Sequence, residues 1–154
     1  MNYWLMKSEP NVYSISDLER DRAEVWDGVR NYQARNFLRQ MQVGDRAFFY
    51  HSNTKLPGIA GLMAVIEASL NDPSQFEPKS PYYDAKSTPE NPRWQTVKVG
   101  YLKTFADYIL LDRLKQTFSP EELLVVKRGN RLSVMPVAKN VAEKILAMAE
   151  TKQN

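Results

Sequence analysis

Residues 26–36 read WDGVRNYQARN, a run of stacking and hydrogen-bonding side chains that leads into a helix. Asp27-Gly28 is a turn signal. The apolar residues that follow recur at i, i+3, i+4 and i+7, which predicts one face of a helix. These residues are Ala34, Phe37, Leu38 and Met41, and the predicted helix covers residues 31–41. Asn31 and Tyr32 at its start could contact a ligand together with Trp26, whereas the plainer alternatives make Asn31 an N-cap and Trp26 a core residue.

Outside this segment, apolar runs rich in Val, Ile and aromatic side chains predict β-strands. The predicted strands cover residues 2–7, 23–26, 46–51, 58–68, 94–105 and 132–134. Gly58 and Gly61 are expected where the sheet bends or another backbone approaches closely. No βαβ rhythm connects these strands, which argues against a doubly wound parallel sheet.

Further helices are predicted before and after the strands, some of them from capping signals. Ser16, with Glu19 three residues later, has the pattern of a capping box. The remaining predicted helices cover residues 107–116, residues 119–125 with Ser119 as N-cap, and residues 136–149, opened by Pro136. The fold class that follows is α+β, a small β-barrel that is mixed and partly open, with flanking short helices.

Residues 69–93 form the longest stretch without a predicted element. Five prolines interrupt it, and it also holds Tyr82 and Tyr83. A loop of this length is usually functional or disordered, and its aromatic side chains argue against plain disorder. Tyrosines close to Arg93 suit base stacking and phosphate contact. The alternative is that Tyr83 and Trp94 pin the loop to the barrel, which we expect of at least one of them.

Length and composition describe one ordinary globular domain. The chain has 154 residues, a formal net charge of +3 and no cysteine. We expect a single domain over residues 1–150 with a C-terminal tail at 151–154. The absence of cysteine excludes disulfides, thiolate nucleophiles and cysteine-based zinc sites. The charge permits a polyanionic partner without requiring one. Without a signal peptide or an apolar run of membrane-spanning length, we expect a cytoplasmic monomer that has no membrane partner and could associate with the nucleoid.

Polar residues gather where two predicted strands end. Lys7-Ser8-Glu9-Pro10 follows the first strand, and His51-Ser52-Asn53 follows the strand at 46–51. His51 is the only histidine, and no Gly-x-Ser-x-Gly elbow supports a Ser–His hydrolase. Carboxylates are scattered, and no glycine-rich phosphate loop is present. We therefore expect neither a metal nor a cofactor, and a binding function in place of an enzymatic one.

Six blocks of this sequence together resemble the EVE domain family. They are residues 3–10, 26–36, 48–53, 82–84, 92–94 and 131–134. Their order is that of the family, and they extend over nearly the whole chain. The resemblance implies a PUA-like fold and kinship with YTH domains, which hold methylated adenine in an aromatic cage. It also implies a reader of modified bases, with methylated or hydroxymethylated cytosine as the usual proposal.

The resemblance also implies roles for individual residues. Lys7 and Ser8 match a pair that lines the pocket, and Trp26 matches a cage tryptophan. The remaining implied base-binding residues are Asn31 and Tyr32 at the pocket wall, His51, Ser52 and Asn53 at its rim or floor, and Tyr82 or Tyr83 as a second aromatic wall. Residues 71–76 depart from the family pattern, so the resemblance implies no roles for them.

The resulting hypothesis is capture of a modified base from DNA or RNA between Trp26 and a loop tyrosine. The candidate phosphate-binding residues are Lys7, Arg30, Arg35 and Arg93. Trp26→Ala is expected to abolish the preference for the modified base and to leave the fold intact. Three alternatives remain: a binder of a free nucleotide or other small molecule, a small hydrolase that uses Ser8 or Ser52 with His51, and a purely structural interaction module.

Overall fold

The computed structural model describes residues 1–150, which form a six-stranded sheet with four α-helices and two 3-10 turns. The strands are β1 (Tyr3–Ser8), β2 (Ala23–Val25), β3 (Arg46–His51), β4 (Gly58–Asn71), β5 (Gln95–Leu110) and β6 (Val134–Val137). The helices are α1 (Ile15–Asp21), α2 (Tyr32–Gln40), α3 (Leu111–Thr117) and α4 (Lys139–Glu150), and the 3-10 turns are η1 (Pro73–Phe76) and η2 (Leu124–Val126). The tail expected at residues 151–154 lies outside the described residues.

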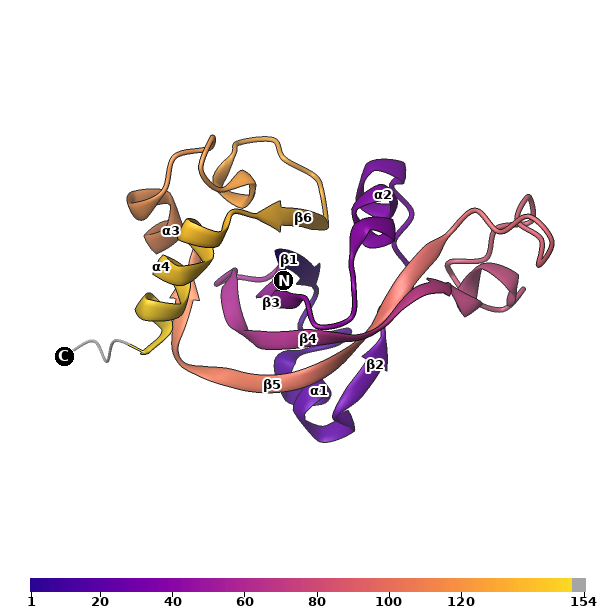
Figure 1. Cartoon of the computed structure of the whole chain (residues 1–154), viewed down its shortest axis with the longest axis horizontal. Coiled ribbons are helices and arrows are strands. Elements are labelled where there is room, and N and C mark those ends of the chain that lie inside the picture. The colour runs from indigo at the N-terminus through magenta and orange to yellow at the C-terminus, as the bar shows by residue number, and fades with distance from the viewer. Residues whose placement is uncertain (151–154) are drawn as a thin grey trace.

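The strands run in the order β2-β5-β4-β3-β1-β6. β1 and β3 are parallel, and every other neighbouring pair is antiparallel. The sheet is therefore mixed, and it stays open between β2 and β6 (Figure 1). These features confirm the expected α+β class. The parallel register pairs Lys7 with Tyr50 and Ser8 with His51, so both polar strand ends lie side by side.

Alternation along β1 and β3 divides the buried side chains between two cores. Successive side chains of a strand point to opposite faces of its sheet. Leu5 and Phe48 belong to the core that α3, η2 and α4 cover. Met6 and Phe49 belong to the core that α1 and α2 cover. Both faces are buried, which explains why β3 is apolar almost throughout.

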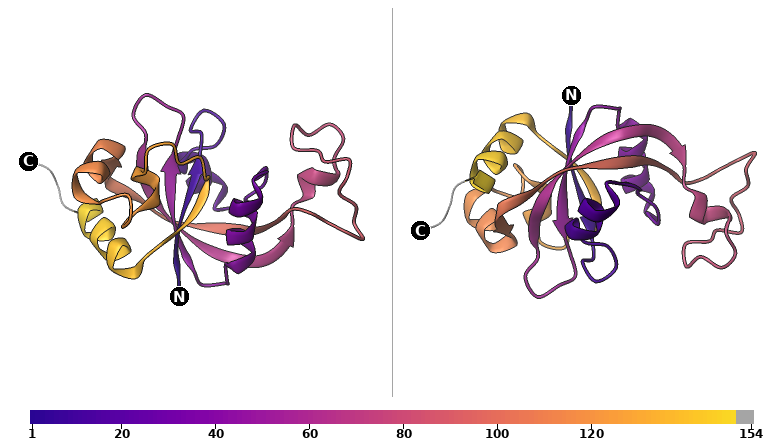
Figure 2. Two further views of the ribbon diagram at one scale, coloured as in Figure 1. Left: turned by 90° about the horizontal axis from the view of Figure 1, so that it is seen from above. Right: turned by 90° about the horizontal axis from the view of Figure 1, so that it is seen from below.

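β4 and β5 form one long ribbon that connects the two ends of the molecule. Figure 2 shows it running from α3 and α4 at one end to the loop that follows β4 at the other. An added Cβ at Gly58 or Gly61 would lie only 2.2 Å or 2.4 Å from a carbonyl oxygen of β5. The expected close backbone approach at these glycines is thus confirmed. The helix expected at 107–116 begins at Leu111, because residues 107–110 continue β5 and pair with β4 up to Leu110.

The helix predicted at residues 119–125 was wrong, and the helix predicted at residues 136–149 was right except at its start. Ser119 and Glu122 exchange backbone–side-chain hydrogen bonds, but the chain makes only a turn there. Leu123 is extended and buried in the core, so local capping yields to tertiary packing. Pro136 lies in edge strand β6 opposite Trp4, where a residue without an N–H is tolerated. The last helix begins at Lys139.

α1 also begins earlier than expected. Its N-cap is Ser14, whose hydroxyl accepts from the Asp17 N–H at 3.2 Å, while the Asp17 carboxylate accepts from the Ser14 N–H at 2.8 Å. This pair forms the capping box that had been expected at Ser16 and Glu19. The shift buries Ile15 and Leu18 against the sheet.

Candidate functional site

A pocket of about 750 Å³ opens beside the C-terminal end of β1. Its wall includes the end of β1, the segment from β2 to the start of α2, Ser52, Tyr82 and the residues just before β6. Its volume falls within the roughly 300–1,000 Å³ of typical small-ligand sites. The pocket thus lies where the sequence predicted a site, at the strand end next to residues 26–31.

Six of the ten predicted base-binding residues line this pocket. They are Lys7, Ser8, Trp26, Asn31, Ser52 and Tyr82. The other four lie elsewhere. Tyr32 stacks on Trp94, Asn53 donates to the Glu9 carboxylate at 2.9 Å, and Tyr83 is exposed without lining the pocket. His51 is the fourth, and its ring packs edge-on against Phe49.

Trp26 forms part of the core as well as of the pocket wall. Its ring is only 7% exposed and meets Phe49 edge-on, with the ring centroids 5.4 Å apart. Its backbone N–H donates to the carbonyl of Val97, and its carbonyl accepts from the Thr96 hydroxyl. Truncation to alanine would leave a cavity that typically costs about 3–5 kcal/mol. The expectation that Trp26→Ala leaves the fold intact is therefore revised.

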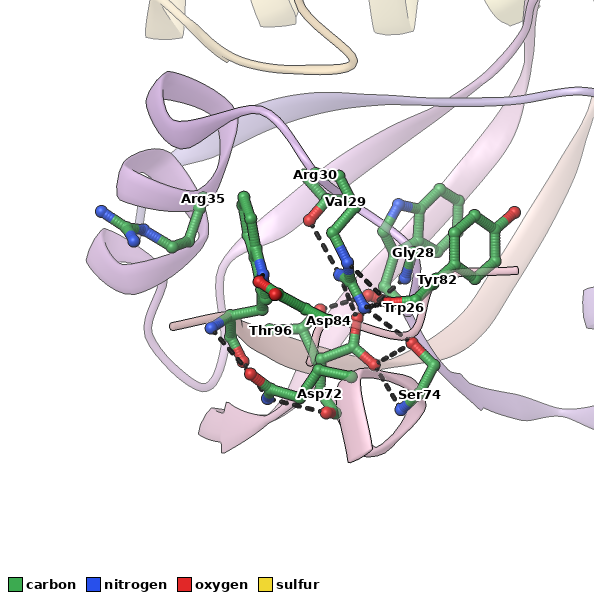
Figure 3. A network of polar contacts seen from close by, with 12 residues as sticks. Trp26, Gly28, Val29, Arg30, Arg35, Asp72, Ser74, Tyr82, Asp84 and Thr96 are labelled. Atoms are coloured by element: carbon green, nitrogen blue, oxygen red, sulfur yellow. Dashed lines mark hydrogen bonds and ion pairs between the residues drawn. The ribbon is translucent and has the colours of Figure 1, made fainter. Parts of the chain in front are cut away.

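Tyr82 packs directly over the turn that follows Trp26. An added Cβ at Gly28 would lie 2.7 Å from the Tyr82 ring, and Gly28 has a φ of +83°. Both the backbone conformation and the contact require glycine here. Tyr82 is 36% exposed, so part of its ring remains available to a ligand. Figure 3 shows Trp26, Gly28 and Tyr82 around the guanidinium of Arg30.

Arg30 uses all five of its N–H donors inside the protein (Figure 3). Two bonds, of 3.0 and 2.7 Å, go to the carbonyl of Tyr82. The other three go to the Val29 carbonyl, the Asp72 carboxylate and the Ser74 hydroxyl, each at 3.0 Å. Arg30 therefore holds the loop that carries Tyr82, and in this structure it has no free donor for a phosphate.

Asp72 is the buried partner of this network, with a carboxylate that accepts four hydrogen bonds. One oxygen accepts from the Gly28 N–H at 2.8 Å and from Arg30 at 3.0 Å. The other accepts from the N–H and the hydroxyl of Ser74 at 2.8 and 2.6 Å. The residue is 1% exposed. Its charge is thus compensated by one cation and three dipoles, as burial requires.

Gln75 and Asp84 fasten the rest of the long loop to Trp94. The buried Gln75 amide donates to the Trp94 carbonyl and accepts from the Trp94 N–H, at 2.8 and 3.1 Å. Asp84 accepts from the indole N–H of Trp94 at 2.8 Å. The expectation that Tyr83 or Trp94 pins the loop is confirmed for Trp94. Sequence reasoning missed Asp72, Gln75 and Asp84, because isolated polar residues in a loop carry no local signal of a buried role.

Arg35 belongs to a stack outside the pocket. The rings of Tyr32 and Trp94 lie 4.9 Å apart at 16°, and the Arg35 guanidinium lies 4.7 Å from the Tyr32 ring. Arg35 also donates to the carbonyl of Arg93 at 2.9 Å. These contacts join the start of α2 to the end of the loop. Neither Arg35 nor Arg93 lines the pocket.

The pocket combines cations with carboxylates. Burial lowers the pKa of the Lys7 ammonium. Desolvation raises the pKa of the Asp27 carboxyl, the negative charges of Asp72 and Glu24 raise it further, and Arg30 opposes them. Arg131, from the turn before β6, is a third cation in the wall, beside Lys7 and Arg30. Sequence reasoning proposed none of Glu24, Asp27 and Arg131 as ligand contacts, although Arg131 lies in one of the blocks that resemble the EVE family.

The candidate Ser–His pair is engaged elsewhere. The Ser8 hydroxyl donates to the Tyr13 carbonyl at 2.6 Å. His51 Nε2 accepts from the Ile15 N–H at 3.1 Å, which occupies the nitrogen lone pair that a general base needs. No cluster of three or more His, Asp or Glu side chains able to hold a metal ion occurs within residues 1–150. Nor does any helix in that range have the length and apolar character needed to cross a membrane.

The fold and the pocket define a class, an α+β domain with a PUA-like open barrel and a ligand-sized pocket at the end of β1. The EVE domain model matches residues 2–148, and the chain belongs to the EVE domain family. It is 41% identical over 169 residues to thymocyte nuclear protein 1 of Mus musculus, an alignment that covers 98% of this chain and 75% of the mouse protein.

Solved structures agree with this family. A Pseudomonas putida protein is 50% identical with a TM-score of 0.92, and the match covers 96% of this chain and 99% of that one. Human thymocyte nuclear protein 1, solved in complex with DNA containing 5-methylcytosine, is 40% identical with a TM-score of 0.90, covering 99% and 100%. A YTH domain from Zygosaccharomyces rouxii shares the fold alone, at 11% identity and a TM-score of 0.58 over 99% of this chain and 89% of that one.

Proposed function

We propose that this protein is a non-catalytic module that binds a modified nucleobase in DNA or RNA, with 5-methylcytosine in DNA as the first candidate. The observation that carries the proposal is the pocket of about 750 Å³ to which Trp26 and Tyr82 contribute aromatic rings. The human relative that was solved with DNA containing 5-methylcytosine has nearly the same fold over the full length of this chain. That similarity supports a nucleic-acid ligand.

The base enters the pocket after leaving its duplex, or from a single strand. Flipping a paired base costs a few kcal/mol. Stacking on an aromatic side chain returns about 1–3 kcal/mol per base. Tyr82 is the aromatic residue best placed to respond to a ligand, because it is partly exposed and stands on the loop that Arg30 holds. Trp26 supplies a rigid wall, since Phe49 and the backbone of β5 fix its position.

Polar groups in the pocket read the edge of the base. A carboxylate can accept from the N4 amino group of cytosine, and Asp27 and Glu24 both line the wall. The side-chain oxygen of Asn31, Oδ1, caps α2 by accepting from the Ala34 N–H, which leaves the side-chain NH2 to donate to the base. Val12, Val25 and Val29 supply apolar surface for a methyl group, whose burial is worth roughly 1–3 kcal/mol.

The hydrogen bonds of Ser8 and His51 support a binder over a hydrolase. Each side chain satisfies a backbone group, at 2.6 Å for Ser8 and 3.1 Å for His51. A serine nucleophile needs a hydrogen bond to its general base. These two residues are register partners on β1 and β3, yet each side chain bonds to the segment 13–15 instead.

Fluorescence anisotropy tests the proposal with labelled DNA and RNA oligonucleotides. Each carries one cytosine or adenine in unmodified, methylated or, for cytosine, hydroxymethylated form. We expect a preference of about tenfold or more for one modified base, equivalent to roughly 1.4 kcal/mol. Equal binding of all oligonucleotides would contradict the proposal. Free nucleosides that bind as tightly as oligonucleotides would indicate a small-molecule binder instead.

Tyr82 variants locate the binding site. Tyr82→Ala should weaken binding of the preferred oligonucleotide about 5- to 150-fold, the equivalent of losing ~1–3 kcal/mol of stacking. Tyr82→Phe keeps the ring and should bind like the wild type. Tyr83→Ala is the matched control, because Tyr83 is an adjacent exposed tyrosine that is not part of this pocket's wall. A Tyr82→Ala variant with unchanged affinity and selectivity would exclude this tyrosine from the site.

A further inference from the structure

A second depression, of about 500 Å³, lies next to the base pocket. The two share Lys7 and Ser52 in their walls, so they meet at the paired ends of β1 and β3. Ser52 is fixed there because its N–H donates to the Ser8 carbonyl at 3.0 Å. The two cavities are therefore neighbours on the protein surface, separated only by these shared residues.

The two cavities differ in charge. The base pocket has Glu9, Glu24 and Asp27 in its wall as well as cations. Among the described residues around the second depression, four are cationic and none is acidic. The four cations are Lys7, Lys115, Lys127 and Arg128. Such a wall suits an anion, and the shared boundary implies that one ligand can present an uncharged part to the first cavity and an anionic part to the second.

The outer cations are free to bind. Lys115, Lys127 and Arg128 are exposed, and within residues 1–150 none of the three forms an ion pair. This contrasts with Arg30, one of the residues that sequence reasoning proposed for phosphate. Its five donors are already used.

The turn that presents two of these cations is built rigidly. Val125 and Val126 of η2 are buried beneath it, and Lys127 donates through its N–H to the Leu124 carbonyl at 3.0 Å. The Asn130 side chain donates to the same carbonyl at 2.7 Å and accepts from the Leu132 N–H at 3.0 Å. The next residue, Arg131, lines the base pocket. One short basic turn, residues 127–131, thus borders both cavities.

We propose that the second depression and the turn 127–131 hold the phosphodiester backbone of the strand whose base occupies the first pocket. The proposal rests on the proposed function and adds to it the surface along which the polynucleotide runs. Phosphates on either side of an extruded base remain covalently attached to it, so they must lie close to the pocket mouth. Lys7 stands at the junction of the two cavities, where the nucleotide's own phosphate would pass.

The test compares the full-length wild type with the double variant Lys127→Gln/Arg128→Gln. Both side chains are exposed, and no side-chain hydrogen bond ties either to residues 1–150, so the fold should be retained, which circular dichroism and thermal unfolding check. The matched control is Lys139→Gln/Lys144→Gln, which removes the same charge from exposed positions of α4 that line neither cavity. The probes are a single-stranded oligonucleotide with one 5-methylcytosine, its unmodified counterpart, and the free nucleoside 5-methyl-2′-deoxycytidine.

Each phosphate contact on a single strand contributes about 0.7 to the slope of log K against log salt. The double variant should therefore show a slope shallower by about 1.4. Its affinity deficit relative to the wild type should shrink about sevenfold when salt is raised fourfold. Nucleoside binding and the ratio of methylated to unmodified affinity should stay at wild-type values, and the α4 control should keep the wild-type slope.

The outcomes separate the two proposals. The phosphate site would be overturned if the double variant kept the wild-type salt slope, or if the α4 control lost as much of its slope as the double variant. In either case, a persisting preference for the methylated oligonucleotide would uphold the base reader. A shallower slope in the double variant, combined with a wild type that does not distinguish methylated from unmodified oligonucleotides, would uphold the phosphate site and overturn the modified-base reader. Nucleoside binding by a wild type that binds no oligonucleotide at low salt would overturn the phosphate site and leave a small-molecule pocket.

Discussion

Asp72 shows how much of the site depends on one buried carboxylate. It receives hydrogen bonds from Gly28 and Arg30 on the pocket side and from Ser74 on the loop side. Through Arg30 it also sets the position of Tyr82, because the same guanidinium donates to the Tyr82 carbonyl. The Arg30 and Asp72 side chains are 22% and 2% exposed, so their ion pair is largely shielded from water.

Asp72→Asn is therefore expected to lower the free energy of unfolding by about 3–5 kcal/mol, because it leaves the Arg30 charge partly buried and unpaired. Urea denaturation measures this change. Glu143→Gln makes the same acid-to-amide replacement at an exposed position of α4 and should shift stability by no more than about 0.5 kcal/mol. A loss of similar size in both variants would mean that the buried network has no special role.

At the scale of the single element, the start of α1 shows which of two possible N-cap serines caps the helix. Ser14 and Ser16 are both serines followed three residues later by an acid, Asp17 or Glu19. Only Ser14 forms the capping hydrogen bonds, and Ser16 is exposed on the helix. The earlier start makes Ile15 the first helical residue, and its side chain is buried in the core beside Leu18.

We expect Ser14→Ala to destabilise the protein by about 1 kcal/mol, the typical cost of losing an N-cap. Ser16→Ala should be close to neutral, since alanine has the highest helix propensity and no capping bond is lost. Thermal or chemical unfolding of the two variants measures the difference. A larger loss for Ser16→Ala than for Ser14→Ala would show that the helix starts where the sequence pattern alone had placed it.

At the scale of the whole molecule, His51 links two distant parts of the chain. It lies at the end of β3, and its Nε2 accepts from the Ile15 N–H at the start of α1. Only the neutral ring can accept this bond. Burial also lowers the pKa of His51 below its ordinary value of 6.5. Folding is therefore coupled to the loss of a proton from this ring.

Because the pKa of His51 is lowered by folding, the protein should become less stable at acidic pH. As the pH falls through 6.5, the unfolded chain takes up a proton on His51 before the folded chain does, so the free energy of unfolding falls. The fall ends below the lowered folded-state pKa. His51→Gln offers an acceptor that does not titrate, so this variant should lose less stability than the wild type between about pH 8 and about pH 5. Identical pH profiles would show that His51 titrates equally in both states.

Much of the architecture could be predicted from local patterns. The apolar runs of β1 and β3, the amphipathic spacing of α2 and the close backbone approach at the glycines of β4 were all predicted from local sequence, and the structure confirms them. The errors fall where local signals compete with long-range pairing. Pro136 looks like a helix start but pairs with Trp4, and Asp107–Leu110 has a helical pattern but extends β5.

The sequence by itself determined the EVE family, the α+β class and the two polar strand ends at Lys7 and Ser52 that border the pocket. Only the tertiary structure decided which side chains are free to meet a ligand. Arg30 is engaged by partners 42 to 52 residues away, and Tyr82, unlike its neighbour Tyr83, packs over Gly28. The physical reason is that a side chain's free donors and exposed surface depend on what distant segments bring to it, and no local pattern encodes those contacts.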